Sequence, residues 1–160
     1  MLTQLFNVPL HFNFYEASQK KADYDLRKIF DGSLVQIKPE LSVTFVDNHD
    51  TQQLQSLEST VENWFKPLAY ALLLLREQGI PKAFFACLYG AEYKDQKDDE
   101  DIEIVLPKVE GLDQMMMERK DLAYDNQVDS CAFAAFAFSV VSTTATSTPP
   151  TSPFSNLRGL

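Results

Sequence analysis

An apolar and β-branched segment that stops at acids and a histidine is the feature of this sequence that most constrains its fold. Residues 41–46 read Leu-Ser-Val-Thr-Phe-Val and predict a strand over 42–46 that is buried on both faces. The polar cluster Asp47-Asn48-His49-Asp50 follows without a gap. Acids and an imidazole at the carboxyl end of a buried strand are typical of the edge of an α/β sheet where catalytic groups gather.

Two further strand-and-helix units are predicted, one on each side of that strand along the chain. Period-two alternation predicts the first strand. A capping box over Ser59–Glu62 predicts the start of the central helix, whose apolar residues recur at helical spacing up to Leu75. The predicted elements, in order, are strand 5–15, helix 23–30 ending at Asp31-Gly32, strand 42–46, the central helix ending before Gly79 and Pro81, strand 83–88 and helix 107–122.

Strands that alternate with helices favour parallel pairing through right-handed crossovers. Three parallel strands alone would leave unpaired backbone along both outer edges and few apolar partners for the helices. We therefore expect an α/β fold that is part of a larger barrel. The character changes near residue 130: segment 131–141 is apolar but shorter than the ~20 residues that span a bilayer, and the Ser/Thr/Pro-rich segment 142–153 predicts an irregular or disordered tail.

The chain is acidic, which limits the partners that it can bind. Its formal net charge is −9, from 23 acids and 14 bases. This excess of acids argues against nucleic acid and against an anionic membrane surface, and it is compatible with a neutral polysaccharide. Cys87 and Cys131 are a poor disulfide framework. The N-terminus has no basic region followed by an apolar run, so no secretory signal is visible and a cytoplasmic location is favoured.

Each candidate residue also has a plainer interpretation. From spacing alone, the favoured interpretation is that Asp47 or Asp50 caps the turn after the strand and that His49 is an ordinary loop residue. The acidic run 95–101 lacks the Asp-x-Asp-x-Asp-Gly calcium pattern and is interpreted as a solvated loop. Cys87 has no obvious histidine partner, which argues against a nucleophilic role. Core packing is expected for Trp64, Leu72 to Leu75, Val109, Leu112 and Met115 to Met117. No Gly-rich turn follows any predicted strand, so a dinucleotide-binding enzyme is not indicated.

Four segments, in order and at similar gaps, resemble one enzyme family. They are 5–18, 43–75 with its runs Gln55–Thr60 and Trp64–Ala71, 79–90, and 118–124. Together they resemble the sixth, seventh and eighth strands, with parts of the following helices, of the liquefying or cytosolic-type α-amylases of glycoside hydrolase family 13. The resemblance covers Leu5 to Asp129. It implies a partial (β/α)8 TIM barrel that consists of the last three strand–helix units. Residues 1–129 would be the C-terminal third of a catalytic barrel, and residues 130–160 would be a low-complexity tail.

The resemblance implies endo-hydrolysis of α-1,4-glucosidic bonds in starch, glycogen or maltooligosaccharide, with retention at the anomeric carbon. Asp50 matches the catalytic carboxylate that stabilises the transition state, and His49 and Gln52 match substrate-binding positions. Calcium is also implied by the family, with ligands mostly outside this chain, and no metal ligand is predicted within it.

The nucleophile and the general acid of a retaining glycosidase lie upstream of the region that resembles the family, and Glu16 matches a non-catalytic position. We therefore expect a truncated chain that does not hydrolyse starch alone. A non-catalytic α-glucan-binding or interaction protein derived from such a barrel stays open as the alternative. Two departures from the family pattern affect the cleft: Gln53-Leu54 stands where Pro-Gly is usual, and Phe85-Ala86-Cys87 stands where Tyr-Gly-Asp is common.

Overall fold

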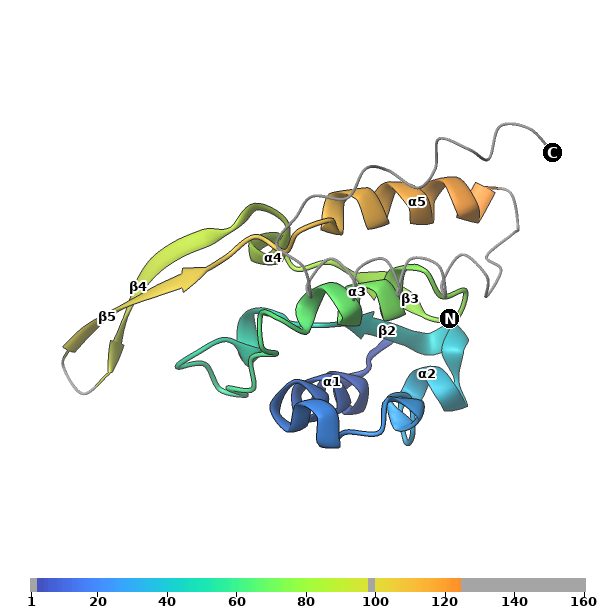
Figure 1. The fold of residues 1–160 in the computed structure, drawn as a ribbon, viewed down its shortest axis with the longest axis horizontal. Coiled ribbons are helices and arrows are strands. Elements are labelled where there is room, and N and C mark those ends of the chain that lie inside the picture. The colour runs from blue at the N-terminus through green and yellow to red at the C-terminus, as the bar shows by residue number, and fades with distance from the viewer. Residues whose placement is uncertain (1–2, 98–99, 125–160) are drawn as a thin grey trace.

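A small parallel sheet is the centre of the structure, a computed structural model that describes residues 3–97 and 100–124 (Figure 1). Its strands are β1 (Leu5–Phe6), β2 (Ser42–Phe45) and β3 (Ile80–Lys82). They lie in the order β1-β2-β3 and pair in parallel, with Phe6 opposite Val43, so β2 is the central strand. The predicted α/β character and the parallel pairing are confirmed.

The described residues also form helices and a β-hairpin. The helices are α1 (Val8–Lys20), α2 (Leu34–Ile37), α3 (Lys66–Leu74), α4 (Phe85–Tyr89) and α5 (Leu112–Tyr124), and single 3-10 turns cover Lys21–Asp23, Leu26–Lys28, Pro39–Leu41 and His49–Thr51. Strands β4 (Ala91–Lys97) and β5 (Glu100–Leu106) pair antiparallel. In Figure 1 this hairpin extends away from the helices, and α3 lies between β2 and α5.

The first predicted strand is wrong beyond its second residue. Strand β1 ends at Phe6, and the rest of the predicted strand is the first part of α1. Asn7 starts this helix because its side chain accepts a hydrogen bond from the Leu10 backbone N–H, and Pro9 suits the first turn. Leu10, Phe14 and Ala17 are buried at helical spacing. The helix predicted over 23–30 is wrong: the range contains the 3-10 turn Leu26–Lys28 and otherwise turns and irregular structure after the turn Lys21–Asp23.

The central strand is confirmed, and all four of its residues are buried. The helix that follows is also found, but its predicted start is wrong. Helix α3 begins at Lys66, and no side chain caps its first turn. Residues 59–62 lie in an irregular segment before the helix. From Ala69 to Leu74 every residue of α3 is buried, as expected for a helix that is apolar on all sides.

The third unit is shifted along the chain. Strand β3 ends at Lys82, and most of the predicted strand 83–88 forms the short helix α4. The acidic run interpreted as a solvated loop belongs to the β4–β5 hairpin, apart from residues 98–99, which lie outside the described residues. The last helix begins at Leu112, later than predicted, after Gly111 with its positive φ of 73°.

The core joins α1, α3 and the start of α5. The predicted core residues Val109, Leu112 and Leu72 to Leu75 are buried. Met115 is also buried, whereas Met116, Met117 and Trp64 are substantially exposed, so their prediction as core is wrong. Arg119 of α5 donates to the carbonyls of Leu74 and Arg76 and so satisfies backbone groups at the end of α3.

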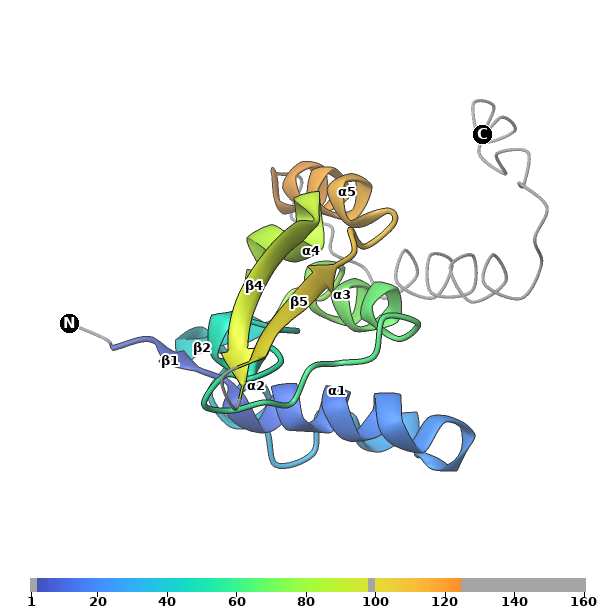
Figure 2. The ribbon, with the colours of Figure 1, turned by 90° about the vertical axis from the view of Figure 1, so that its left-hand side faces the viewer.

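Figure 2 shows α5, α3 and α1 in successive layers, with the hairpin running past their ends. Within the described residues, no helix has the length and the apolar character needed to cross a membrane. The predicted tail, residues 130–160, lies outside the described residues.

Candidate functional site

A tight turn follows the central strand and presents the residues singled out in the sequence. We call residues Asn48–Thr51 the strand-end turn. The Asn48 side-chain oxygen accepts hydrogen bonds from the backbone N–H groups of Asp50 at 2.9 Å and Thr51 at 3.1 Å. The Thr51 hydroxyl oxygen accepts the backbone N–H of Asn48 at 3.1 Å, which completes a capping box. The backbone of Asp50 is therefore fixed from both sides.

The side chains of His49 and Asp50 face solvent. Their side-chain exposures are 85% and 46%, and Nε2 of His49 lies 3.4 Å from Oδ1 of Asp50. A carboxylate and an imidazole thus stand together on an open surface at the carboxyl end of β2. This is an arrangement that a ligand with several hydroxyl groups can reach, since both groups hydrogen-bond hydroxyls.

Gln52 is placed differently from its two neighbours. The residue is buried, and its Nε2 donates a hydrogen bond to the Asn48 carbonyl at 3.0 Å. Its amide is therefore used to close the strand-end turn. The role of Gln52 in substrate binding stays a prediction, and it would require this side chain to turn outward.

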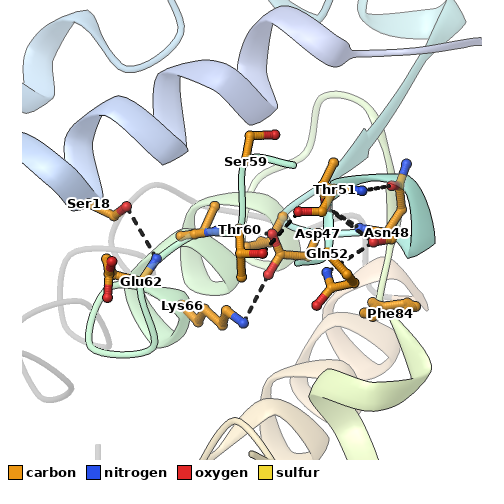
Figure 3. A network of polar contacts seen from close by, with 12 residues as sticks. Ser18, Asp47, Asn48, Thr51, Gln52, Ser59, Thr60, Glu62, Lys66 and Phe84 are labelled. Carbon is orange, nitrogen blue, oxygen red and sulfur yellow. Dashed lines mark hydrogen bonds and ion pairs between the residues drawn. The ribbon is translucent and has the colours of Figure 1, made fainter. Parts of the chain in front are cut away.

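A buried ion pair lies beneath the strand-end turn (Figure 3). The Lys66 ammonium is 3.0 Å from Oδ2 of Asp47, and the two side chains are 3% and 0% exposed. Oδ1 of Asp47 accepts the backbone N–H of Val61 at 3.2 Å. The sequence analysis treated Asp47 only as a turn residue and did not single out Lys66. An acid directly after a buried strand was the available signal for Asp47.

The segment from Ser59 to Lys66, which we call the return segment, is bonded to the strand-end turn. Thr60 donates its hydroxyl to the Thr51 carbonyl at 2.9 Å, and the Ser59 N–H donates to the same carbonyl at 3.1 Å. Farther along, the Ser18 hydroxyl accepts the Glu62 N–H at 3.2 Å, which attaches the return segment to α1 (Figure 3). The capping box predicted at Ser59–Glu62 is therefore wrong: Ser59, Thr60 and Glu62 bond to Thr51 and Ser18 and hold an irregular segment before the helix.

His11 is a second histidine near the site, but it is enclosed. Its Nδ1 lies 2.6 Å from the Val46 carbonyl and its Nε2 lies 2.8 Å from the Ser59 hydroxyl. Because a carbonyl only accepts, Nδ1 carries a proton. Burial lowers the pKa of His11, against the opposing effects of the Val46 hydrogen bond and the Asp47 charge. The His11 ring stacks on the Phe45 ring, with 5.4 Å between the ring centroids. This residue was missed because it was assigned to a strand.

The remaining candidate groups do not join the site. Burial raises the pKa of the Cys87 thiol, so at neutral pH it is protonated and unsuited to nucleophilic attack. Glu16 is exposed on α1 and pairs with Lys20 at 2.8 Å. In the described part of the chain no group of three His, Cys, Asp or Glu side chains could hold a metal ion, so these residues do not fit the calcium that the family resemblance implies.

A cavity lies beside the site and not at it. It has a volume of about 620 Å³ and lies between the return segment, α1 and the end of β5, with Ser59, Thr60 and Lys66 in its wall. His49 and Asp50 do not line it. The two candidate side chains therefore stand on an open surface outside the cavity.

No family model matches this chain. Among curated proteins, it is 50% identical over 126 residues to the cytoplasmic alpha-amylase of Escherichia coli (strain K12), which covers 78% of this chain and 26% of that protein. It is 46% identical over 125 residues to an alpha-amylase of Bacillus licheniformis, covering 78% and 23%. It is 58% identical over 86 residues to the glucan 1,4-alpha-maltohexaosidase of Bacillus sp. (strain 707), covering 54% and 17%.

The chain thus spans about a quarter, or less, of the length of these relatives. Identity of 46–50% across most of the chain is far beyond what shared composition produces. The family resemblance seen in the sequence is confirmed, and the chain is homologous to a segment of the α-amylases of glycoside hydrolase family 13.

Proposed function

We propose that this chain is part of an α-amylase-type glycoside hydrolase that cleaves internal α-1,4-glucosidic bonds of starch or glycogen with retention at the anomeric carbon. The observation that carries the proposal is the exposed pair Asp50 and His49 at the carboxyl end of β2, in a chain that is 50% identical to an alpha-amylase over 126 residues. Asp50 is the catalytic carboxylate among these residues, and His49 binds the substrate.

The geometry of the strand-end turn supports these roles. Asp50 sits on a backbone held by two hydrogen bonds to Asn48, and its carboxylate is free to accept hydroxyl groups. A fixed acceptor stabilises a charged transition state better than a mobile one, because it needs no reorganisation when positive charge develops on the sugar ring. His49 adds a hydrogen-bonding group beside it.

The proposal includes a partial (β/α)8 barrel. Retaining hydrolysis needs a nucleophile and a general acid about 5 Å apart. The family resemblance implies that both lie in a portion of the relatives that this chain does not span. We therefore propose that residues 1–129 are the C-terminal third of a catalytic barrel, that 130–160 form a separate tail, and that the chain alone does not hydrolyse starch. Calcium, where the whole enzyme uses it, is held by residues elsewhere.

The substrate class and the location follow from the same proposal. The names of the relatives point to α-glucan substrates, and the acidic charge of this chain is compatible with a neutral polymer. A cytoplasmic location agrees with the name of the Escherichia coli relative and with the sequence prediction, and it is proposed on these grounds.

The proposal is tested by replacement. The matched segment of the Escherichia coli amylase is exchanged for the corresponding residues of this chain, and release of reducing sugar from starch is measured. We expect the chimera to hydrolyse starch and Asp50→Asn to lower kcat by about 100-fold or more. Asp121→Asn on α5 is the matched control and should leave kcat unchanged.

Two results would count against the proposal. One is a folded chimera whose activity does not depend on Asp50. The other is starch hydrolysis by the isolated 160-residue chain that Asp50→Asn abolishes, because this chain would then contain a complete site.

A further inference from the structure

We propose that Asp47 and Lys66 are positioning residues: their buried ion pair holds Asp50 and His49 in place without touching the substrate. This inference rests on the proposed function, because it assigns a task to a pair that lies directly beneath the proposed site. The two residues come from different elements. Asp47 follows the central strand and Lys66 opens α3, so their contact connects the strand end to the helix.

The location of Lys66 is unfavourable by itself. It is the first residue of α3, where the positive end of the helix macrodipole repels a cation, and no side chain caps this helix start. The ammonium is also buried, at 3% side-chain exposure. A buried ion pair contributes little to stability compared with apolar residues of the same size, because both charges lose their hydration. A role in stability alone therefore explains this pair poorly.

Asp47 depends on that cation. Within residues 3–97 and 100–124, Oδ2 of Asp47 has no hydrogen-bond partner of good geometry, and the Lys66 ammonium at 3.0 Å compensates its charge. The other oxygen holds the Val61 N–H at 3.2 Å. One carboxylate thus fixes two points of the return segment, Val61 and Lys66, directly below the strand-end turn.

We call Asp47, with its contacts to Lys66 and Val61, the clamp. Short hydrogen bonds connect the clamp to Asp50. Next to Val61, the Thr60 hydroxyl donates to the Thr51 carbonyl at 2.9 Å. Thr51 closes the capping box with Asn48, which in turn holds the Asp50 N–H at 2.9 Å. The Asp50 carbonyl also accepts the Leu57 N–H at 2.9 Å. The clamp, the return segment and the strand-end turn therefore form a closed ring with Asp50 on its outer side.

The test compares binding with folding in the full 160-residue chain. The double variant Asp47→Asn/Lys66→Met keeps an acceptor for Val61 and removes both buried charges together, so neither is left unpaired. Affinity for maltoheptaose is measured by titration calorimetry, thermal unfolding reports on the fold, and amide hydrogen exchange at Leu57 and Ser59 reports on the turn. Lys20→Met is the matched control, because it removes the exposed Lys20–Glu16 pair.

We expect the double variant to keep its melting temperature within a few degrees, to bind maltoheptaose at least about tenfold more weakly, and to exchange the Leu57 and Ser59 amides faster. The single variant Lys66→Arg, which keeps the positive charge opposite Asp47, should retain most of the affinity. Unchanged binding and unchanged exchange in a folded double variant would overturn the inference.

Two other outcomes are also decisive. If the unaltered chain binds no maltoheptaose, the proposed function is still judged by the chimera, and the inference is judged by exchange alone: unchanged Leu57 and Ser59 exchange overturns it, and faster exchange supports it. If the double variant does not fold, Thr60→Val replaces it, since this change removes the Thr60 hydroxyl bond to the Thr51 carbonyl with little change in volume. Weaker binding or faster exchange at an unchanged melting temperature then supports the inference, and no change in either overturns it.

Discussion

Leu54 shows how one residue can reveal a strained backbone. Its φ is +66°, in the left-handed region where a side chain with a Cβ costs about 1–2 kcal/mol. We expect Leu54→Gly to be about 1 kcal/mol more stable than Leu54→Ala, because both lose the leucine side chain and only glycine relieves the strain. Urea unfolding of the two variants measures the difference. An alanine variant as stable as the glycine variant would show that this conformation costs nothing here.

His11 should make stability depend on pH. Burial lowers its pKa below the ordinary value of 6.5, so between these two pKa values the unfolded chain binds a proton that the folded protein does not. The free energy of unfolding therefore falls as pH drops below about 6.5, by at most about 1.4 kcal/mol per pH unit from this group.

Urea midpoints at several pH values between 7.5 and 5 test this expectation. His11→Gln removes the titrating group, so its stability should change less with pH over that range. His49→Gln, which removes the exposed second histidine of the chain, is the control. Equal slopes for the unaltered chain and His11→Gln would contradict the prediction.

At this scale the sequence predicts best where neighbours in the chain decide the outcome. His49 and Asp50 follow a buried strand directly, and their placement on an open surface agrees with a site there. The pairing of Asp47 with Lys66 was not predictable, because it depends on the path of an irregular loop between them. No periodicity describes such a loop.

Among the helices and strands, too, residue periodicity predicts some elements and not others. Strand β2 was predicted correctly, because a run of apolar and β-branched residues interrupted only by Ser42 fits a strand buried on both faces. In the first unit, Leu10 and Phe14 fit both a period of two and a spacing of four, so strand and helix could not be separated by periodicity. The decisive signal was Asn7 followed by Pro9, a helix start that the alternation concealed.

Asn7 connects α1, α2 and β2, and its loss should be costly. It is fully buried; its oxygen accepts the N–H groups of Leu10 and Leu34, and its amide donates to Ser42. We expect Asn7→Ala to lower the free energy of unfolding by about 3 kcal/mol, because it removes a helix cap and leaves buried donors without acceptors.

Asn13→Ala is the matched control for this experiment. Asn13 lies on the same helix and donates to the carbonyls of Ile29 and Asp31 in a more exposed setting. Its loss should cost less than half as much, since water can replace these bonds. Chemical unfolding measures both variants, and equal losses would show that Asn7 is no special junction.

For the whole molecule, the outer edges of the sheet are the main consequence of the strand order. Among the described residues, β1 and β3 each pair only with β2. The sequence analysis expected open edges from the count of strands, and it could not foresee the β4–β5 hairpin because charged residues conceal its alternation. A sheet with free edges in a chain that spans a quarter of its relatives agrees with the proposed partial barrel.

Free edges should also make the isolated chain associate with itself. Leu5 and Phe6 on β1 are 51% and 60% exposed, so an apolar strand edge faces solvent. We expect the 160-residue chain to form oligomers whose mass rises with concentration in light scattering, and Phe6→Lys to shift it toward the monomer, because a charged edge strand resists pairing. Leu57→Lys, at an exposed loop leucine, is the control. A chain that stays monomeric at all concentrations, or a Phe6→Lys variant that associates equally, would show that another surface covers β1.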